Sequence, residues 1–204
     1  GDVYKRQTLH IQLLGTFRLL HDDVPLTDID TPRLQSFLAY LLLHRAAPQS
    51  RSYLSFIFWP DSTESQARTN LRKQLYHLRH ALPDAEYYIH ADSNTIHWHA
   101  QDRFTIDVAE MARALDDSEQ AQQAGDSDAQ SAALDRAISL YAGDLLPSSY
   151  DEWIFPERER LRRRAISTLE RLADMLEEAG AYQEATHHLR HLLRLDPLHE
   201  QAYR

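Results

Sequence analysis

Cysteine is absent from all 204 residues of the chain, which excludes disulfides, thiolate zinc sites and cysteine nucleophiles. No apolar run approaches the roughly 18 residues that a membrane-spanning helix needs, and no charged start precedes an apolar run with a cleavage site. The chain also has no Gly-Lys-Ser/Thr phosphate loop, no phospho-acceptor receiver domain, and no paired acids or nucleophile in a convincing setting. We therefore expect a soluble cytoplasmic protein that has no cofactor, does not contact a membrane and is not an enzyme.

The acidic balance of the chain is confined to its second half. The formal net charge is −9, but residues 1–98 hold ten Lys and Arg against ten Asp and Glu. The remainder holds twelve basic and twenty-one acidic residues and carries the whole excess. Since a nucleic-acid contact needs a basic face more than a basic chain, this asymmetry is compatible with a DNA-binding first half and a partner-binding second half.

The first half begins with short strands and a helix. Residues 1–7 show no period and are interpreted as a leader or artefact outside the fold. Residues 8–13, 16–20 and 24–26 are rich in apolar and β-branched residues between turn signals, which predicts a small antiparallel sheet. A Thr-Pro pair at 31–32 then begins a helix whose buried side holds leucines and aromatics.

Two further helices follow, joined by a tight turn. Ser50 is predicted to cap a helix over residues 51–59, which a proline ends. Asp61 with Glu64 has the spacing of a capping box, which predicts the start of a long helix over residues 61–82. Its apolar residues recur every three or four positions, as a core-facing stripe requires: Ala67, Leu71, Leu75, Leu78 and Leu82.

The opposite face of the 61–82 helix is basic and polar. It holds, with no acid among them, Arg68, Thr69, Arg72, Lys73, Tyr76, His77, Arg79 and His80. Such a face suits a polyanion, and a helix-turn-helix with a basic second helix is typical of DNA recognition. The alternative is an ordinary amphipathic helix with a solvated polar face, so the neighbouring segments must decide between the two.

A β-hairpin is predicted soon after this helix. Strands over residues 87–90 and 95–99 flank the turn-forming sequence Ala-Asp-Ser-Asn. A hairpin in this place is a wing, and Trp98 is interpreted as part of its core. The wing has no Lys or Arg between Arg79 and Arg103, only histidines, which narrows the expected DNA contacts largely to the helix.

From residue 107 onward the pattern is helical. Apolar residues at helical spacing predict helices over residues 107–123, 129–141, 156–179 and 182–195. The last pair fits the tetratricopeptide repeat, whose signature positions hold Leu172, Ala173, Leu176, Gly180, Ala185, Leu189 and Pro197. Residues 198–204 begin a further helix, so we expect the protein to continue beyond this chain.

Three other features each allow a functional and a structural interpretation. Trp153 is either a partner anchor or, as we prefer, a core residue between its loop and the following helix. The spacing of His187, His188 and His191 allows two imidazoles to meet, but a solvated face is favoured over a metal site. The arginine-rich segment 158–164 is a second DNA contact or, with its interleaved glutamates, a salt-bridged surface.

Five segments of the sequence together carry a family resemblance: LLGTFRLL, RLQSFLAYLLLHR, FWPDSTESQARTNLRKQLYHLRHAL, FTIDVAEMARAL and YAGDLLPSSYDEWIFPERERLR. With them, the chain resembles an OmpR-like winged-helix domain joined to a bacterial transcriptional activation domain, as in the Streptomyces antibiotic regulatory protein family. The resemblance implies an α+β winged helix-turn-helix domain over residues 8–100. An all-α, tetratricopeptide-like domain is implied over residues 101–204.

The resemblance implies a sequence-specific transcriptional activator at the nucleoid, which binds promoter repeats in double-stranded DNA through its winged helix. RNA polymerase or a second copy of the chain is the partner it implies for the repeat domain. The implied DNA contacts are Ser62, Thr63, Arg68, Thr69, Arg72, Lys73, Tyr76, His77 and His80. Amides of the first two would hold a phosphate, and Arg72 or Lys73 would pair with guanine or a phosphate. The alternative is a tetratricopeptide-type adaptor whose winged helix does not bind DNA; neither function needs a metal.

Overall fold

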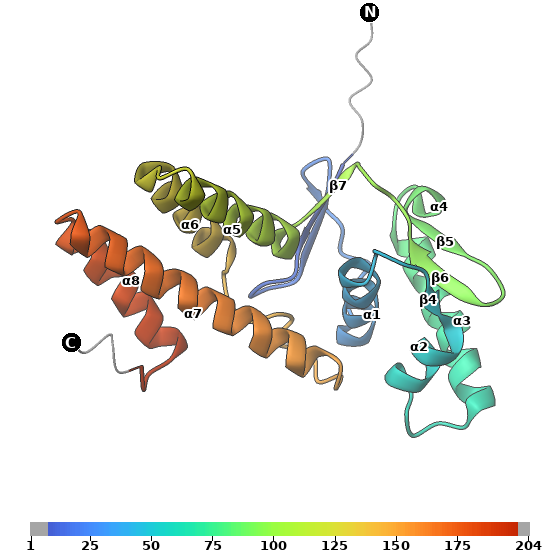
Figure 1. Cartoon of the computed structure of the whole chain (residues 1–204). Helices are drawn as coiled ribbons and strands as arrows, with labels where there is room; N and C mark the ends of the chain where they lie inside the picture. Colours follow the sequence, from blue (N-terminus) through green and yellow to red (C-terminus); the bar gives the residue numbers. More distant parts are fainter. Residues whose placement is uncertain (1–7, 200–204) are drawn as a thin grey trace, which may run out of the picture. The chain divides into compact units, whose positions relative to one another are not determined.

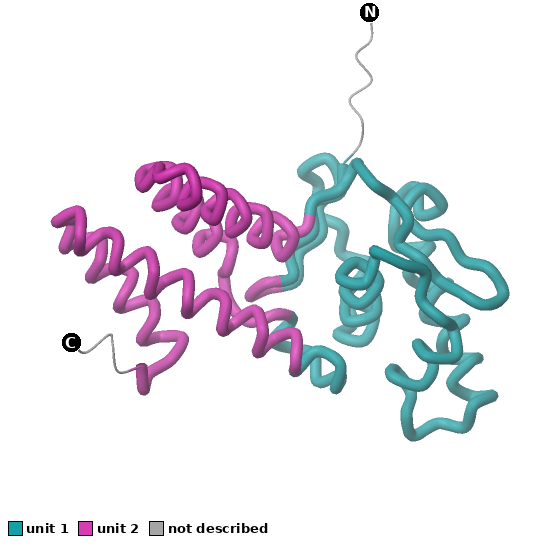
Figure 2. The backbone as a smooth tube through the Cα atoms, viewed as in Figure 1, with its two compact units in different colours: residues 1–13, 17–105, 146–155 teal, residues 14–16, 106–145, 156–204 magenta. Residues whose placement is uncertain are grey.

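The computed structural model describes residues 8–199, which form two compact units (Figure 2). The first unit consists of residues 8–13, 17–105 and 146–155; the second consists of residues 14–16, 106–145 and 156–199. Each unit therefore includes a segment that is distant in sequence from its main part. The predicted domain bounds, 8–100 and 101–204, remain predictions. The predicted leader over residues 1–7 and the predicted helix at 198–204, beyond its first two residues, lie outside the described residues.

A small antiparallel sheet forms the start of the first unit. Strands β1 (Leu9–Gln12), β2 (Arg18–His21) and β3 (Val24–Pro25) pair in sequence order, which confirms the three predicted strands. A fourth strand, β7 (Phe104–Ile106), lies on the other side of β1 (Figure 1). The sequence analysis missed β7, because three residues are too few to show a strand period.

Three helices of the first unit follow the predicted order. Helix α1 (Pro32–Leu43) is capped by Thr31, α2 (Arg51–Phe58) is capped by Ser50, and α3 (Glu64–Ala81) comes next. Helix α3 packs against α1 and α2. All five residues of its predicted apolar stripe, including Leu82 just beyond the helix, are at most 6% exposed. The stripe therefore belongs to the core, as predicted.

The predicted start of the long helix is wrong by three residues. The helix begins at Glu64, and the Thr63 hydroxyl caps it by accepting the Gln66 backbone N–H at 3.2 Å. Residues Thr63 to Gln66 themselves have the Ser/Thr-x-x-Glu/Gln capping pattern, which competes with the pattern that starts at Asp61. The Ser62 N–H instead donates to the Trp59 carbonyl at 3.2 Å, so Ser62 belongs to the turn between α2 and α3.

The hairpin after α3 differs in detail from the prediction. A short helix, α4 (Ala85–Tyr88), takes part of the first predicted strand, and the hairpin consists of β5 (Ile89–Ala91) and β6 (Thr95–Trp98). A two-residue strand, β4 (Gln49–Ser50), pairs with β6 and completes a second sheet. Trp98 is fully buried and stacks on Tyr88 with ring centroids 5.1 Å apart, which confirms its place in the core.

Residues 146–155 return to the first unit and pack against α1. The Trp153 indole N–H donates to the Ser36 hydroxyl at 3.0 Å, and its ring meets the Tyr40 ring edge-on at 5.1 Å. The Arg33 guanidinium pairs with the Asp151 carboxylate at 2.7 Å. Trp153 therefore packs within the fold as preferred, although its partner is α1 rather than the helix that follows it.

The second unit is mostly helical. Its helices are α5 (Asp107–Gln123), α6 (Ser127–Leu140), α7 (Ile154–Glu178, which enters the unit at residue 156) and α8 (Tyr182–Leu195). All four were predicted, but α6 and α7 each begin two residues earlier than expected. Helix α6 does so because Asp126 caps it, accepting the Ala129 backbone N–H at 2.9 Å.

A polar network joins the loop after α6 to α7, and the same loop pairs through its backbone with residues 14–16. Arg162 forms an ion pair with Asp144, and the Tyr141 hydroxyl donates to the same carboxylate at 2.9 Å. Burial by itself would raise the pKa of Asp144, but these two hydrogen bonds hold that pKa below its ordinary value. Gly15 adopts φ +84°, and a Cβ there would lie 3.0 Å from the Ala142 carbonyl carbon, so glycine suits this approach.

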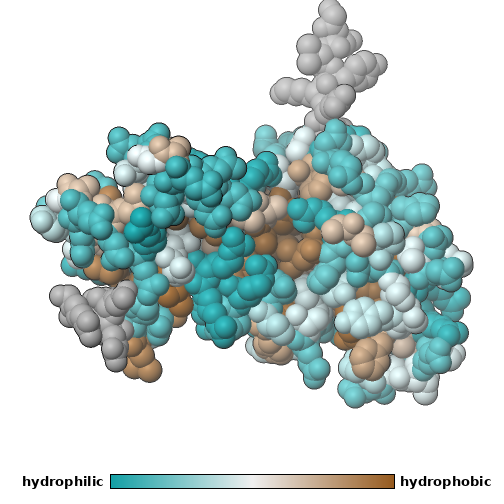
Figure 3. Space-filling model, viewed as in Figure 1, coloured by the Kyte–Doolittle hydropathy of each residue, from teal (hydrophilic) through white to brown (hydrophobic). Residues whose placement is uncertain are grey.

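The surface of the described residues sets further limits. Figure 3 shows mostly hydrophilic residues on the face that it presents, with small hydrophobic areas between them. Within residues 8–199, no helix is long and apolar enough to cross a membrane, and no three His, Cys, Asp or Glu residues gather as a metal site. His188 instead lies 3.7 Å from Asp135, and burial lowers the pKa of both His188 and His191.

Replacing Trp153 by alanine should lower the free energy of unfolding of the first unit by about 2 kcal/mol, because a large half-buried ring is lost. Tyr150, in the same segment, is 81% exposed and gives a matched control whose alanine variant should unfold at nearly the wild-type midpoint. Urea denaturation monitored by far-ultraviolet circular dichroism, which reports the backbone and not the tryptophan ring, measures the unfolding midpoints of both variants. Equal midpoints for the two variants would contradict the packing of residues 146–155 on α1.

Replacing Thr63 by alanine should lower the free energy of unfolding by about 1 kcal/mol, since the cap of α3 is lost. Replacing Asp61 by alanine should change it by only a few tenths of a kcal/mol, because Asp61 lies outside the helix. The same denaturation measurement compares the two. A larger loss for Asp61→Ala than for Thr63→Ala would restore the capping box first predicted at Asp61.

Candidate nucleic-acid interface

The polar face of α3 is open to solvent along most of its length. Because the stripe from Ala67 to Leu82 is buried, the helical period turns the opposite side outward. Of the nine residues predicted to contact DNA, Ser62 and Thr69 are half-buried and the other seven are exposed, namely Thr63, Arg68, Arg72, Lys73, Tyr76, His77 and His80. The amide of Ser62 is an exception to the predicted roles, because it already donates to Trp59.

A basic hollow of about 600 Å³ lies at the N-terminal half of α3. Residues of α2, of α3 and of the turn between β5 and β6 line it: Arg51, Ser52, Ser65, Arg68, Thr69, Leu71, Arg72, Ser93 and Asn94. Three of these side chains are guanidinium groups, and five are hydroxyls or an amide. No carboxylate lines this hollow. Such a set of donors matches the phosphate oxygens of a nucleic-acid backbone.

Backbone pairing places the β5–β6 turn beside the start of α2. Strand β4 directly precedes α2 and pairs with β6, and the Arg51 N–H donates to the Asn94 carbonyl at 2.9 Å. Asp92 closes the turn by accepting the backbone N–H groups of Asn94 and Thr95, each at 2.7 Å. These two hydrogen bonds lower the pKa of Asp92, so its carboxylate stays ionised at neutral pH and keeps its role in the turn.

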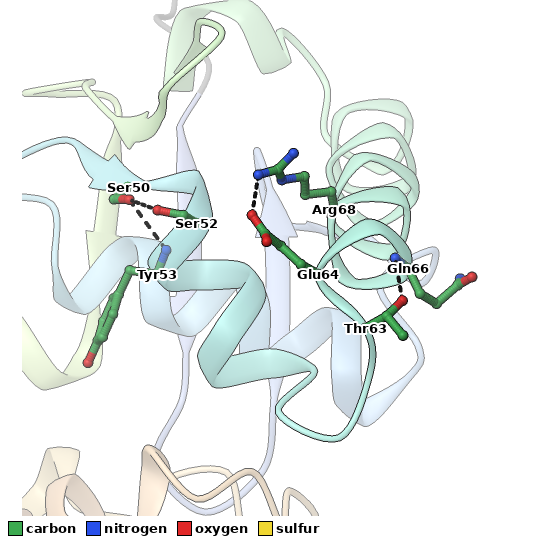
Figure 4. A network of polar contacts seen from close by, with 7 residues as sticks. All are labelled: Ser50, Ser52, Tyr53, Thr63, Glu64, Gln66 and Arg68. Atoms are coloured by element: carbon green, nitrogen blue, oxygen red, sulfur yellow. Dashed lines mark hydrogen bonds and ion pairs between the residues drawn. The ribbon is translucent and has the colours of Figure 1, made fainter.

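The arginines of the hollow differ in how they are engaged. Figure 4 shows the Arg68 guanidinium turned back to the Glu64 carboxylate, with which it forms an ion pair. Both side chains are more than 60% exposed, so this pair contributes little to stability and a phosphate can replace Glu64. Arg72 donates only to the Thr69 hydroxyl, at 3.3 Å. Within residues 8–199 the side-chain Nε of Arg51 is buried without a hydrogen-bond partner.

The C-terminal half of α3 carries a separate aromatic cluster. The rings of Tyr76 and His80 lie 3.9 Å apart, and those of Tyr76 and His77 lie 5.7 Å apart. The Nδ1 atom of His80 lies 2.8 Å from the Tyr76 carbonyl oxygen, which fixes the imidazole along the helix. These three residues and Lys73 do not line the basic hollow, so the predicted contact residues within α3 fall into two groups on one helix face, while Ser62 and Thr63 precede the helix.

Five residues of the hollow were missed by the sequence analysis: Arg51, Ser52, Ser65, Ser93 and Asn94. The cap at Ser50 did predict that the next two residues begin α2, and a helix start beside a recognition helix is a typical place for a phosphate contact. Nothing comparable in the sequence indicates that the turn at Ser93 lies beside Arg51. That proximity depends on the pairing of β4 with β6, which joins residues more than forty positions apart.

Comparisons with known proteins identify relatives of the chain. Residues 106–204 match the family described as bacterial transcriptional activator domain. The chain is 26% identical over 192 residues to the regulatory protein AfsR of Streptomyces coelicolor, which covers 94% of this chain and 19% of that protein. It is 24% identical over 170 residues to AfsR of Streptomyces griseus, covering 83% of this chain and 17% of that protein.

The chain thus spans less than a fifth of the length of these curated relatives. Among solved structures, Mycobacterium tuberculosis EmbR, determined in complex with a low-affinity phosphopeptide, has a TM-score of 0.82 to it and 21% identity. The match covers 97% of this chain and 53% of EmbR, and it shows a shared fold. Residues 106–204 thus belong to the bacterial transcriptional activator domain family, and the chain as a whole is similar to Streptomyces regulatory proteins over most of its length.

Proposed function

We propose that the chain is the DNA-binding part of a transcriptional activator, and that α3 enters the major groove of double-stranded promoter DNA. The observation that supports this most is the basic hollow at α3, which is lined by three arginines and by no carboxylate; Glu64, the partner of Arg68, lies outside the lining. Neutral amide and hydroxyl donors surround these arginines, as in sites that position a protein on a nucleic-acid backbone. The family of the chain consists of regulators, which supports a regulatory and not an enzymatic role.

The exposed residues of α3 are proposed to make two kinds of DNA contact. In the proposed complex, Arg68 and Arg72 lie on the side of the hollow and contact phosphates or guanine, whereas Lys73, Tyr76, His77 and His80 face the bases or the opposite strand. An α-helix with its polar side outward fits the width of the major groove, and Arg or Lys pairs with guanine O6 and N7. Thr69 lies between the two arginines and can donate to a phosphate or contact a thymine methyl group.

The β5–β6 hairpin takes part through its position and not through its charge. It has no Lys or Arg, but its turn places Ser93 and Asn94 in the hollow beside Arg51. In the proposed complex Arg51 supplies the charge for a phosphate that the hairpin turn contacts with neutral donors. Contacts are therefore expected from α2 and the hairpin in addition to α3, which widens the site first predicted from the sequence.

The second unit is proposed to bind a protein partner. Helices α7 and α8 form a pair joined at Gly180, which adopts φ +75° with open space around it, and its spacing resembles a tetratricopeptide pair. Such a pair buries one face and leaves another for a second copy of the chain or for RNA polymerase. DNA binding would place the protein at the nucleoid. The alternative remains an adaptor that binds proteins only, and duplex DNA binding discriminates between the two.

Replacing both Arg72 and Lys73 by alanine should weaken binding to promoter DNA and flatten its salt dependence. Each lost phosphate contact should make the slope of log affinity against log salt about 0.9 less steep. Fluorescence polarisation with a labelled duplex at several salt concentrations measures this. Arg190→Ala with Arg194→Ala removes the same charge from the exposed side of α8 and is the matched control. Unchanged affinity in the Arg72 and Lys73 variant would refute the role of α3.

Replacing Arg51 by alanine tests the contribution of α2 and the hairpin. Affinity should fall for every duplex sequence to a similar extent, because a phosphate contact carries no sequence information. The salt slope should decrease by about 0.9, as for one lost contact. Arg18→Ala, an exposed arginine on β2, is the control and should bind as the wild type does. An Arg51 variant with wild-type affinity and slope would confine the DNA contacts to α3.

A further inference from the structure

The second unit contains a hollow of about 630 Å³ that the proposed DNA contact does not use. Helices α5 and α6 line one side of it and α7 lines the other; Figure 1 shows these helices. Its lining residues are Leu115, Ser118, Glu119, Gln122, Gln130, Leu134, Arg163, Arg164, Ser167, Thr168 and Arg171. The hollow thus combines arginines, a buried amide and leucines, with a single carboxylate.

The arginine-rich start of α7 is only partly a salt-bridged surface. Arg160 pairs with Glu157 at 2.9 Å, Arg162 pairs with Asp144, and Arg163 pairs with Glu159 at 3.0 Å. Within residues 8–199, neither Arg164 nor Arg171 forms an ion pair, and both line the hollow. Two guanidinium groups without a carboxylate partner are therefore available to a ligand there.

A buried amide provides a second, independent indication of a ligand. Gln130 is only 5% exposed, and its side-chain amide forms no side-chain hydrogen bond among residues 8–199; the amide is not among the fully enclosed polar atoms that lack a partner, so it reaches the hollow that it lines. The other buried polar residues of the hollow are satisfied internally. The Ser118 hydroxyl donates to the Leu115 carbonyl and the Thr168 hydroxyl donates to the Arg164 carbonyl, each at 2.7 Å. A peptide group of a ligand in the hollow would pair with both the donor and the acceptor of this amide.

The apolar lining of the hollow favours a peptide over DNA. Leu115 is half-buried and lines the hollow together with Leu134, so the hollow offers some aliphatic surface that a phosphate backbone does not use. Carboxylates pair well with guanidinium groups, and a leucine or isoleucine side chain fits against Leu134.

We propose that this hollow binds a short acidic peptide segment of another protein. Arg164 and Arg171 hold its carboxylates, Gln130 pairs with its backbone, and Leu115 and Leu134 contact an aliphatic side chain. The proposal does not rest on DNA binding by the first unit, since the two sets of residues do not overlap. The second unit would then recognise a partner by the charge and backbone of one extended segment.

Selection from a displayed library of random heptapeptides, with the whole chain as bait, tests the proposal directly. The enriched peptides should contain Asp or Glu together with an aliphatic residue. Fluorescence polarisation with the most enriched peptide should show binding about tenfold weaker for the chain with Arg164→Gln and Arg171→Gln. Replacing the peptide's acidic residues by their amides should weaken binding to the wild-type chain to a similar extent.

Two further variants separate a site from general effects of charge or folding. Arg190→Gln with Arg194→Gln removes the same charge from α8, outside the hollow, and should bind the peptide as the wild type does. Gln130→Leu keeps the side-chain volume and the net charge. It should lower the affinity for the peptide severalfold, while circular dichroism and the melting temperature show that the chain is folded.

Several results would overturn the proposal. Among them are a selection without acidic enrichment, equal peptide binding by the Arg164 and Arg171 variant and the control, and undiminished binding by a folded Gln130→Leu variant. If instead the Arg164 and Arg171 variant lost duplex DNA affinity with a flatter salt slope, the hollow would be a second DNA contact and the peptide proposal would be wrong.

Discussion

Burial of one stripe of α3 is the constraint on which the rest of the first unit depends. Each leucine of the stripe contributes about 2 kcal/mol by leaving water, and together they fix the rotation of α3 against α1 and α2. Because the helical period is fixed, that rotation also fixes which residues face solvent. Packing of the stripe in the core therefore determines that the polar face of α3 points to solvent. A residue on that face can be replaced without disturbing the packing.

Segments distant in sequence complete both units. Strand β4 joins the hairpin to the start of α2, β7 joins the first sheet, and residues 146–155 bring Trp153 to α1. In the second unit, residues 14–16 pair with the loop that follows α6. The units are consequently not two consecutive stretches of chain. Removing residues 146–155 from the first unit would expose the side of α1 that Trp153 covers.

Charge in this acidic chain is organised by local pairing. Most arginines at the start of α7 have a carboxylate partner, while the hollow at α3 and the hollow beside α7 each retain guanidinium groups without one. Net charge alone would have favoured neither a nucleic-acid contact nor an acidic ligand. Local potential depends on the few charges that lie within about 10 Å of a surface at moderate ionic strength, so the pairing pattern matters more than the total.

The sequence by itself determined the helices of eight or more residues, the first strands, and the buried and polar faces of α3, because these depend on local period and on caps such as Thr31 and Ser50. It placed the start of α3 wrongly, since two capping patterns overlap within six residues. Only the tertiary structure decided the short strands, the approach of Ser93 to Arg51, and the lining of one hollow by both Gln130 and Arg171. Each of these joins residues far apart in the chain, and no local pattern specifies which distant segment will bury or pair with a given side chain.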